Sequence, residues 1–149
     1  MPTATNAKLT LTKVGDTDIR VDVTYDFNLS RLESHLVGAG FGVGFTELVQ
    51  IIGIDPPGST TGTTMQVVGS RIVDDAVNQD EPQTLKRSYT RTFPRASLDE
   101  DRSFVAAAGD NDEIRCRIRL ICHGLPEALT NTFTNQVILF EDAGTTVTR

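Results

Sequence analysis

The stretch that decides the fold reads Ile114-Arg115-Cys116-Arg117-Ile118-Arg119-Leu120-Ile121-Cys122-His123. Every even position is apolar, and the first three odd positions are arginines. Successive side chains of a β-strand point to opposite faces, so a period of two predicts a strand with one face in a core and the other lined with guanidinium groups. We therefore predict that residues 114–123 form a central strand.

Other apolar patterns bounded by turn residues predict further strands on both sides of this one. They cover residues 7–14, 19–27, 43–54, 65–73, 84–93 and 133–141. Ser30 followed three residues later by Glu33 is a capping box, which predicts a short helical insertion near residues 30–37. About seven strands without a long helical period predict an all-β fold, namely a two-sheet antiparallel β-sandwich with an immunoglobulin-like strand order.

The immunoglobulin-like order also predicts which strands share a sheet. Residues 114–123 should lie between 43–54 and 133–141 in one sheet, whereas the other sheet should hold 7–14, 19–27 and 84–93. The last of these strands is ambiguous, because Arg87 and Arg91 share the parity of its apolar residues. Either a bulge shifts the register, or these arginines reach past the edge of the core to carboxylates such as Glu47.

Length and composition indicate a single folded domain. A chain of 149 residues can bury a substantial core without a metal or a disulfide, and we expect that core to span about residues 7–142, with polar arms at 1–6 and 143–149. The formal net charge of −6 argues against a nucleic-acid partner on electrostatic grounds. No stretch resembles a signal peptide or a membrane span, so we expect synthesis in the cytoplasm without a leader and no membrane partner. The final location, such as an assembled particle or an extracellular structure, stays open.

No pattern in the sequence is typical of an enzyme. Only two histidines occur, His35 and His123, and there is no nucleophile elbow. Cys116 and Cys122 are six positions apart on one strand, roughly 20 Å, which is too far for a disulfide or a shared zinc ion. We therefore expect two buried thiols, no resident cofactor and no catalytic residues.

Acidic residues gather in two turns that flank one connection, at 99–101 and 110–113. Carboxylate oxygens are ligands that calcium prefers. A calcium site is therefore one interpretation, with the candidate ligands Asp99, Asp101, Asp110 and Asp112. An EF-hand is excluded because Phe104 occupies the position that requires glycine, and solvated turn residues are the simpler interpretation.

The arginine row is the most informative surface feature. Three cations spaced two residues apart repel one another unless neighbouring groups supply anions. The flanking strands are apolar on both parities, and such strands are usually covered on both sides. We therefore predict an interface on the outer face of this sheet, formed by Arg115, Arg117, Arg119, Leu48, Ile52, Ile138 and Phe140. Two alternatives stay open: the arginines pair within the chain, or they bind a nucleic acid or another polyanion.

These patterns favour a non-enzymatic structural or interaction protein. We expect a β-sandwich subunit that assembles with copies of itself or with other subunits into a particle or filament, as viral-type structural proteins do. The second hypothesis is a calcium- or ligand-binding module that uses the acidic turns at 99–101 and 110–113.

Overall fold

The computed structural model describes residues 1–38, 42–54, 62–73, 80–99, 112–124 and 129–139. Within them the elements follow in the order β1 (Thr3–Val14), β2 (Asp18–Leu29), α1 (Arg31–Gly38), β3 (Gly44–Gly53), β4 (Thr64–Val73), β5 (Gln83–Pro94), the 3-10 turn η1 (Arg95–Ser97), β6 (Asp112–His123) and β7 (Leu129–Leu139). All neighbouring strands pair antiparallel. The predicted all-β class with one short helix is confirmed for the described residues.

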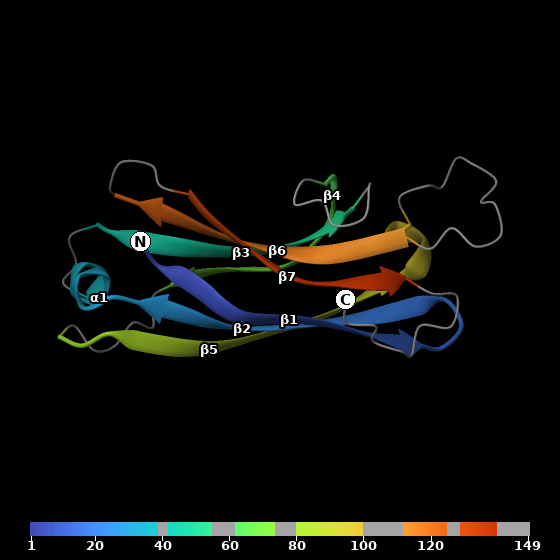
Figure 1. Ribbon diagram of the computed structural model, residues 1–149, viewed down its shortest axis with the longest axis horizontal. Helices are drawn as coiled ribbons and strands as arrows, with labels where there is room; N and C mark the ends of the chain where they lie inside the picture. Colours follow the sequence, from blue (N-terminus) through green and yellow to red (C-terminus); the bar gives the residue numbers. More distant parts are fainter. Residues whose placement is uncertain (39–41, 55–61, 74–79, 100–111, 125–128, 140–149) are drawn as a thin grey trace.

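The strands form two sheets that lie one above the other (Figure 1). One sheet has the order β1-β2-β5, and the other has the order β4-β3-β6-β7. β6 therefore lies between β3 and β7, and β2 lies between β1 and β5. These are the partners that the sequence predicts for the central strand and for the three strands of the other sheet.

The core lies between the sheets, and the alternation along each strand decides which side chains enter it. On β6 the even positions are buried, as predicted: Ile114, Cys116, Ile118, Leu120 and Cys122. On β2 the odd positions are buried: Ile19, Val21, Val23, Tyr25 and Phe27. The rings of Phe27 and Phe45 meet edge to face with their centroids 6.4 Å apart, which joins the two sheets through aromatic contact.

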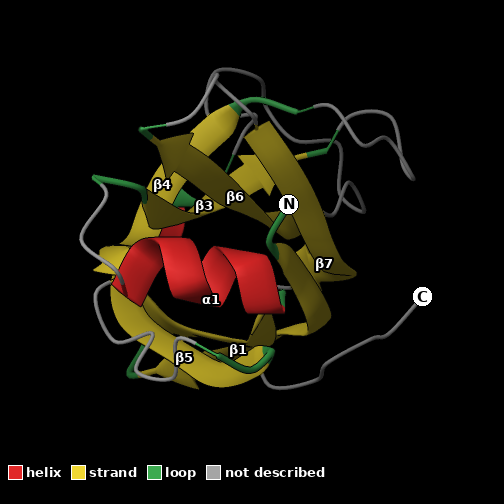
Figure 2. Ribbon diagram, turned by 90° about the vertical axis from the view of Figure 1, so that its left-hand side faces the viewer, coloured by secondary structure: helices red, strands yellow, loops and turns green. Residues whose placement is uncertain are grey.

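Helix α1 lies across one end of the space between the sheets (Figure 2). Its first turn has the predicted capping box: the Glu33 amide donates to Ser30 Oγ over 3.3 Å, and the Ser30 amide donates to Glu33 Oε2 over 2.8 Å. These two bonds satisfy backbone donors that a helix N-terminus leaves without partners. The helix therefore begins where the sequence predicts.

Side-chain hydrogen bonds link the two sheets along both of their long sides. Between β1 and β7, the Leu9 amide donates to Asn135 Oδ1 over 2.8 Å, and Asn135 Nδ2 donates to the Leu9 carbonyl over 3.4 Å. Between β5 and β4, Arg91 Nη1 donates to the Val67 carbonyl over 2.8 Å. These bonds use backbone groups of edge strands that would otherwise be available for pairing with another chain.

The N-terminal residues differ from the prediction. Thr3–Asn6, expected as part of a polar arm, form the start of β1, and Thr3, Ala4 and Thr5 pair with the end of β2. The register shifts between Thr5 and Lys8, where Asn6 has a positive φ of 54°. Because Ala4 is buried against the core, the strand begins four residues earlier than the apolar pattern indicates. The second predicted arm, residues 143–149, lies outside the described residues.

Candidate interaction surface

The three arginines of the predicted row lie side by side on the outer face of the four-stranded sheet. Since the even positions of β6 enter the core, the odd positions face outward, and Arg115, Arg117 and Arg119 are all half-buried. On β3 they lie opposite residues that also face outward: Arg119 pairs with Leu48, Arg117 with Gln50, and Arg115 with Ile52. The row therefore runs along the middle of this face, because β6 is an inner strand.

Among the described residues, few acidic side chains lie beside the guanidinium groups of this row. Arg117 Nη2 donates to Gln50 Oε1 over 3.1 Å and to Thr64 Oγ1 over 2.8 Å, and both acceptors are neutral. Arg119 makes no hydrogen bond or ion pair within the described ranges. Arg115 does interact with other groups, and Glu113, two positions before it on the same side of β6, is the one acidic residue that the described strands add to this face.

Apolar side chains surround the arginines. Leu48 on β3, Ile121 on β6 and Phe133 on β7 are half-buried, and Phe133 lies opposite Arg117 in the register. On the edge strand β4, Ile72 is 68% exposed and Val67 is 37% exposed. We call this surface the arginine face and define it by Arg115, Arg117, Arg119, Ile121, Thr46, Leu48, Gln50, Val67, Ser70, Ile72, Asn131 and Phe133.

One residue predicted for this surface is not on it. Ile52 is completely buried, because the segment entering β4 folds over it. The Gly53 amide donates to the Thr63 carbonyl over 3.1 Å, and a Cβ added to Gly62 would lie 3.6 Å from the Ile52 Cβ. The chain itself therefore covers Ile52, which cannot contact a partner without movement of residues 62–64.

The other predicted interface residues fall into two groups. Leu48, Arg115, Arg117 and Arg119 are brought together on the arginine face. Ile138 belongs to β7, but its side chain is not among those described, and Phe140 lies outside the described residues. Sequence reasoning missed Val67 and Ile72, two exposed apolar residues of this face, because β4 has only a weak alternating pattern.

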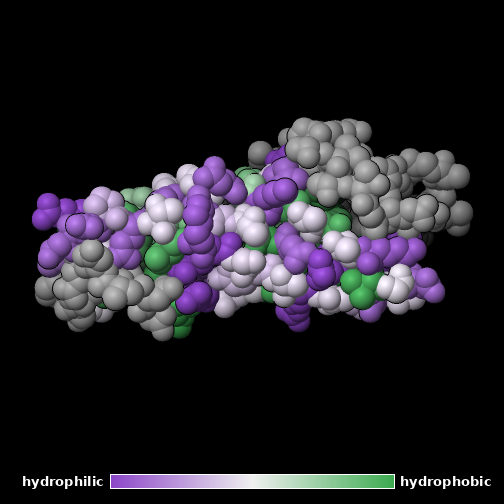
Figure 3. Space-filling model, turned by 90° about the horizontal axis from the view of Figure 1, so that it is seen from below, coloured by the Kyte–Doolittle hydropathy of each residue, from purple (hydrophilic) through white to green (hydrophobic). Residues whose placement is uncertain are grey.

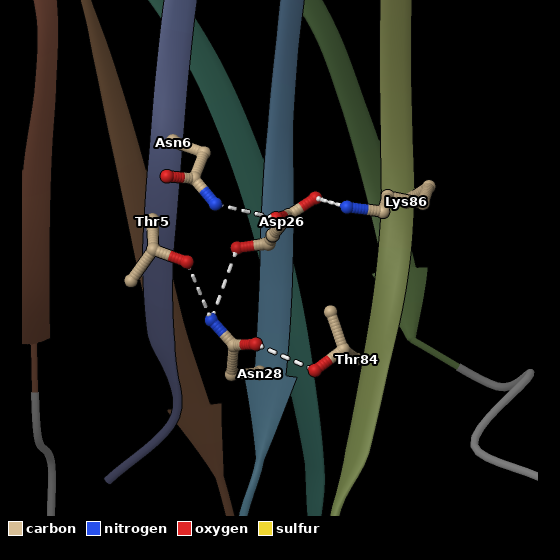
Figure 4. Close-up of polar contacts among 6 residues, drawn as sticks. All are labelled: Thr5, Asn6, Asp26, Asn28, Thr84 and Lys86. Atoms are coloured by element: carbon tan, nitrogen blue, oxygen red, sulfur yellow. Dashed lines mark hydrogen bonds and ion pairs between the residues drawn. The ribbon is translucent and has the colours of Figure 1, made fainter.

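The outer face of the three-stranded sheet has a different character, which is mostly polar in Figure 3. On it the Asp26 carboxylate, 7% exposed, accepts hydrogen bonds of 2.7 Å from both Asn6 Nδ2 and Lys86 Nζ (Figure 4). Beside it, Asn28 accepts from the Thr84 hydroxyl over 2.8 Å and donates to Thr5 Oγ1 over 2.9 Å. The lysine and asparagine contacts hold the pKa of Asp26 below its ordinary value. This face satisfies its central carboxylate internally.

A second charged pair is buried between the two sheets. Arg87 Nε donates to Glu47 Oε2 over 2.8 Å and to Oε1 over 3.1 Å, and the Tyr25 hydroxyl donates to Oε1 over 2.6 Å. β5 pairs with β2 without a register shift, so no bulge lies at Arg87. Arg87 points into the core because its guanidinium pairs with Glu47 there. Arg91 instead reaches the opposite edge strand and lies over the Phe93 ring.

This buried pair is suited to structure, not to chemistry on a ligand. Glu47 is fully buried and both of its oxygens are occupied by Tyr25 and Arg87. Burial raises the pKa of the Glu47 carboxyl above its ordinary value, and its contacts with these two partners oppose the rise. Burial, followed by the nearby carboxylate, also raises the pKa of the Tyr25 hydroxyl. The pair links β3, β5 and β2 across the core.

The remaining predicted residues are widely separated. Asp99 is exposed after η1, the Asp112 side chain is not described, and Asp101 and Asp110 lie outside the described residues. Among the described residues no group of three histidine, cysteine or acidic side chains converges in a way that could hold a metal ion. The two cysteines are free and buried, and burial raises the pKa of the Cys116 thiol to about 12, so this thiol stays protonated.

Comparison with known proteins does not assign a family. No protein-family model and no curated protein matches the chain. Among solved structures, the crystal structure of a protein from Archaeoglobus fulgidus is similar at 14% sequence identity and a TM-score of 0.38, over 88% of this chain and 95% of that chain. Similarity at this level identifies no function. Within the described residues, no helix is long and apolar enough to cross a membrane.

Proposed function

We propose that this protein is a non-enzymatic structural subunit that joins a larger homo-oligomeric assembly through its arginine face. The observation that carries the proposal is the combination of a central arginine row with exposed apolar side chains, above all Ile72 at 68% exposure. Protein interfaces are enriched in arginine and aromatic residues and have a partly apolar centre. The proposed assembly is a particle or a filament.

The contrast between the two outer faces supports this assignment. On the three-stranded sheet, Asp26 bonds to Asn6 and Lys86, Asn28 bonds to Thr5 and Thr84, and the outer face is mostly polar (Figure 3). On the arginine face, Arg117 and Arg119 have no acidic partner in the described part of the chain, and Leu48 is only half-buried. A second protein surface could supply both the apolar cover and the charge that this face lacks.

We also propose an immunoglobulin-like arrangement for the two sheets. The strand order β1-β2-β5 against β4-β3-β6-β7 supports it, as does the position of β6 between β3 and β7. The fold alone does not assign a partner.

Light scattering coupled to size-exclusion chromatography tests the proposed self-association. We expect the mass of the protein to rise with concentration, and the double variant Val67→Ser/Ile72→Ser to shift association to higher concentration, because both side chains are exposed and contribute apolar surface. Val14→Ser is the matched control, since Val14 is 42% exposed on the other sheet. A strict monomer at high concentration would rule out the proposal.

Calcium binding at the acidic turns is the second candidate function. Asp99 is exposed at the start of the segment that carries these turns, where its carboxylate is accessible to an ion. A thermal melt with and without millimolar calcium tests it. A rise in melting temperature that Asp99→Asn reduces would support a calcium site, and an unchanged melting temperature would exclude one.

A further inference from the structure

We infer that β5 of one copy pairs edge to edge with β5 of a second copy, so that two three-stranded sheets join into one six-stranded sheet. The strand order of the joined sheet is β1-β2-β5-β5-β2-β1. This contact is separate from the arginine face, which belongs to the other sheet, and it goes beyond the proposed function. Its occupant is the same strand of the second copy.

The free edge of β5 is long and regular. The strand runs over twelve residues, Gln83–Pro94, and pairs with β2 along its whole length without a register shift. Within the described residues β2 is its only strand partner, so the backbone groups on the far side of β5 are not used by another strand. Such an edge is a template for pairing with another chain unless bulges, prolines or charged side chains interrupt it.

The other three edge strands are interrupted. β1 shifts register after Thr5, and both backbone groups of its Leu9 are bonded to Asn135. β7 shifts register once against β6, and β4 shifts twice against β3. The Val67 carbonyl of β4 also accepts from Arg91. Among the described edge strands, β5 is therefore the one whose pairing has no shift.

The charged side chains of β5 do not guard its edge, because they are bonded within their own chain. Lys86 turns towards β2, where its Nζ donates to Asp26 Oδ1 over 2.7 Å (Figure 4). Arg87 is buried and pairs with Glu47, and Arg91 reaches across to β4. A strand that pairs with β5 therefore meets no charge that lacks a partner.

Two-fold symmetry restricts the register of such a pair. Residues opposite each other in an antiparallel pair point to the same face, so the axis must pass beside a residue and not between two residues. The two most central positions of the strand are Ser88 and Tyr89. An axis at Tyr89 places Arg87 of one copy opposite Arg91 of the other, and like charges directly opposite each other are destabilising. The axis at Ser88 avoids this contact.

The register centred on Ser88 also brings opposite charges closer together. It places Lys86 of one copy opposite Thr90 of the other. The Thr90 hydroxyl donates to Asp22 Oδ1 of its own chain over 2.7 Å, and Asp22 lies opposite Thr90 on β2. Lys86 of one copy and Asp22 of the other are then two strand spacings apart, roughly 10 Å, which favours this register over one with like charges in contact.

A contact at β5 has a consequence for assembly. A two-fold contact uses the same surface on both copies, so the β5 edge alone ends at a dimer. The arginine face lies on the four-stranded sheet and remains available in such a dimer. Copies that use both surfaces can continue into a filament or close into a ring.

Charge-swap variants of Ser88 test this inference on the full-length protein. Ser88 is exposed and lies opposite Ser88 of the second copy in this register, so Ser88→Lys and Ser88→Glu each place like charges at the axis. We expect each variant alone to associate at least about tenfold more weakly than the wild type in light scattering. An equal mixture of the two variants should recover the association, because the charges at the axis are then opposite.

Thr24→Lys is the matched control. Thr24 is exposed on the same face and lies opposite Ser88 on β2. The two copies of this lysine would be three strand spacings apart, roughly 14 Å, which exceeds the screening length of about 8 Å at physiological ionic strength. The control should therefore associate as the wild type does. Circular dichroism of each variant shows whether a loss of association comes from unfolding.

Amide hydrogen exchange locates the contact. Alternate amides of β5 point away from β2, and we expect them to exchange at least about tenfold more slowly when the protein is concentrated enough to associate. Val67→Ser/Ile72→Ser should leave this protection in place, because both residues belong to β4.

The outcomes distinguish this inference from the proposed function. Association without slower exchange in β5 overturns the inference and leaves the arginine face as the contact. Folded Ser88 variants that associate as tightly as the wild type overturn it as well, and so does a mixture that fails to recover. A protein that stays monomeric at high concentration overturns both.

Discussion

Replacing Arg87 with methionine isolates the contribution of the buried ion pair. Methionine retains an unbranched apolar side chain and removes the guanidinium, whose Nε lies 2.8 Å and 3.1 Å from the two Glu47 oxygens. The side chain of Arg87 is 4% exposed and that of Glu47 is fully buried, so water cannot take the place of the lost partner. The variant therefore leaves a carboxylate in the core that keeps the hydrogen bond from the Tyr25 hydroxyl but loses both of those from Arg87.

We expect this change to lower the free energy of unfolding by about 3 kcal/mol, the lower end of the range of roughly 3–5 kcal/mol for a buried pair that loses one member. The lower end applies because Arg71 lies opposite Glu47 in the β3–β4 register and its charge also favours the ionised carboxylate. A domain of this size has an unfolding free energy of about 5–15 kcal/mol, so the variant should fold but with a much smaller margin.

The double variant Glu47→Leu/Arg87→Met should recover most of the loss. Removing both charges also removes the desolvation penalty. The remaining loss of stability comes from the Tyr25 hydroxyl, which is left without an acceptor, and amounts to about 1–3 kcal/mol.

The free energy of unfolding of the single variant Arg87→Met should also depend on pH. In Arg87→Met the folded-state pKa of Glu47 lies above its unfolded value of about 4.3, so the penalty is absent below that pH and grows as pH rises through the folded-state pKa.

Urea unfolding of the wild type, both single variants and the double variant, at pH 7 and near pH 4.5, measures these differences as a double-mutant cycle. Equal slopes with urea concentration would show that the unfolded states are comparable. The reasoning fails if Arg87→Met lies within about 1 kcal/mol of the wild type at pH 7, or if the double variant is less stable than Arg87→Met.

Three further substitutions test other parts of the structure. Gly69→Ala should lower stability by about 1–3 kcal/mol in thermal melts, because the added Cβ would lie 2.3 Å from the ring of Tyr89; Gly44→Ala, with open space around it, is the control and should change little. Asp26→Asn should remove part of the acid sensitivity of folding. The pKa of Asp26 is lowered in the folded state, so its stabilising contribution is present above the unfolded-state pKa of about 3.9 and is lost as pH falls through the folded-state pKa. Acid titration followed by circular dichroism should therefore give a flatter curve for the variant. Ser30→Ala should lower the unfolding free energy by about 1 kcal/mol through loss of the helix cap, whereas no change in urea unfolding would indicate that the cap contributes nothing.

Local sequence patterns determined which residues form strands and which of their faces enter the core. The alternation along residues 114–123 was sufficient to place Cys116 and Ile118 inside and the arginines outside, because the side-chain period of a strand is a property of the backbone itself. The cap of α1 was equally predictable, since Ser30 and Glu33 satisfy backbone donors only a few residues away.

Tertiary structure decided what covers each face, because that depends on residues distant in the sequence. The parity of Arg87 allowed either a bulge or an ion pair, and only the unshifted β2–β5 register, which brings Arg87 to Glu47 forty residues away, selected the pair. Ile52 has the same sequence character as Leu48, yet one is covered by residues 62–64 and the other remains half-exposed. The first strand begins at Thr3 because β2 supplies hydrogen-bonding partners for its backbone. The polar and irregular sequence of residues 3–6 does not by itself predict a strand there.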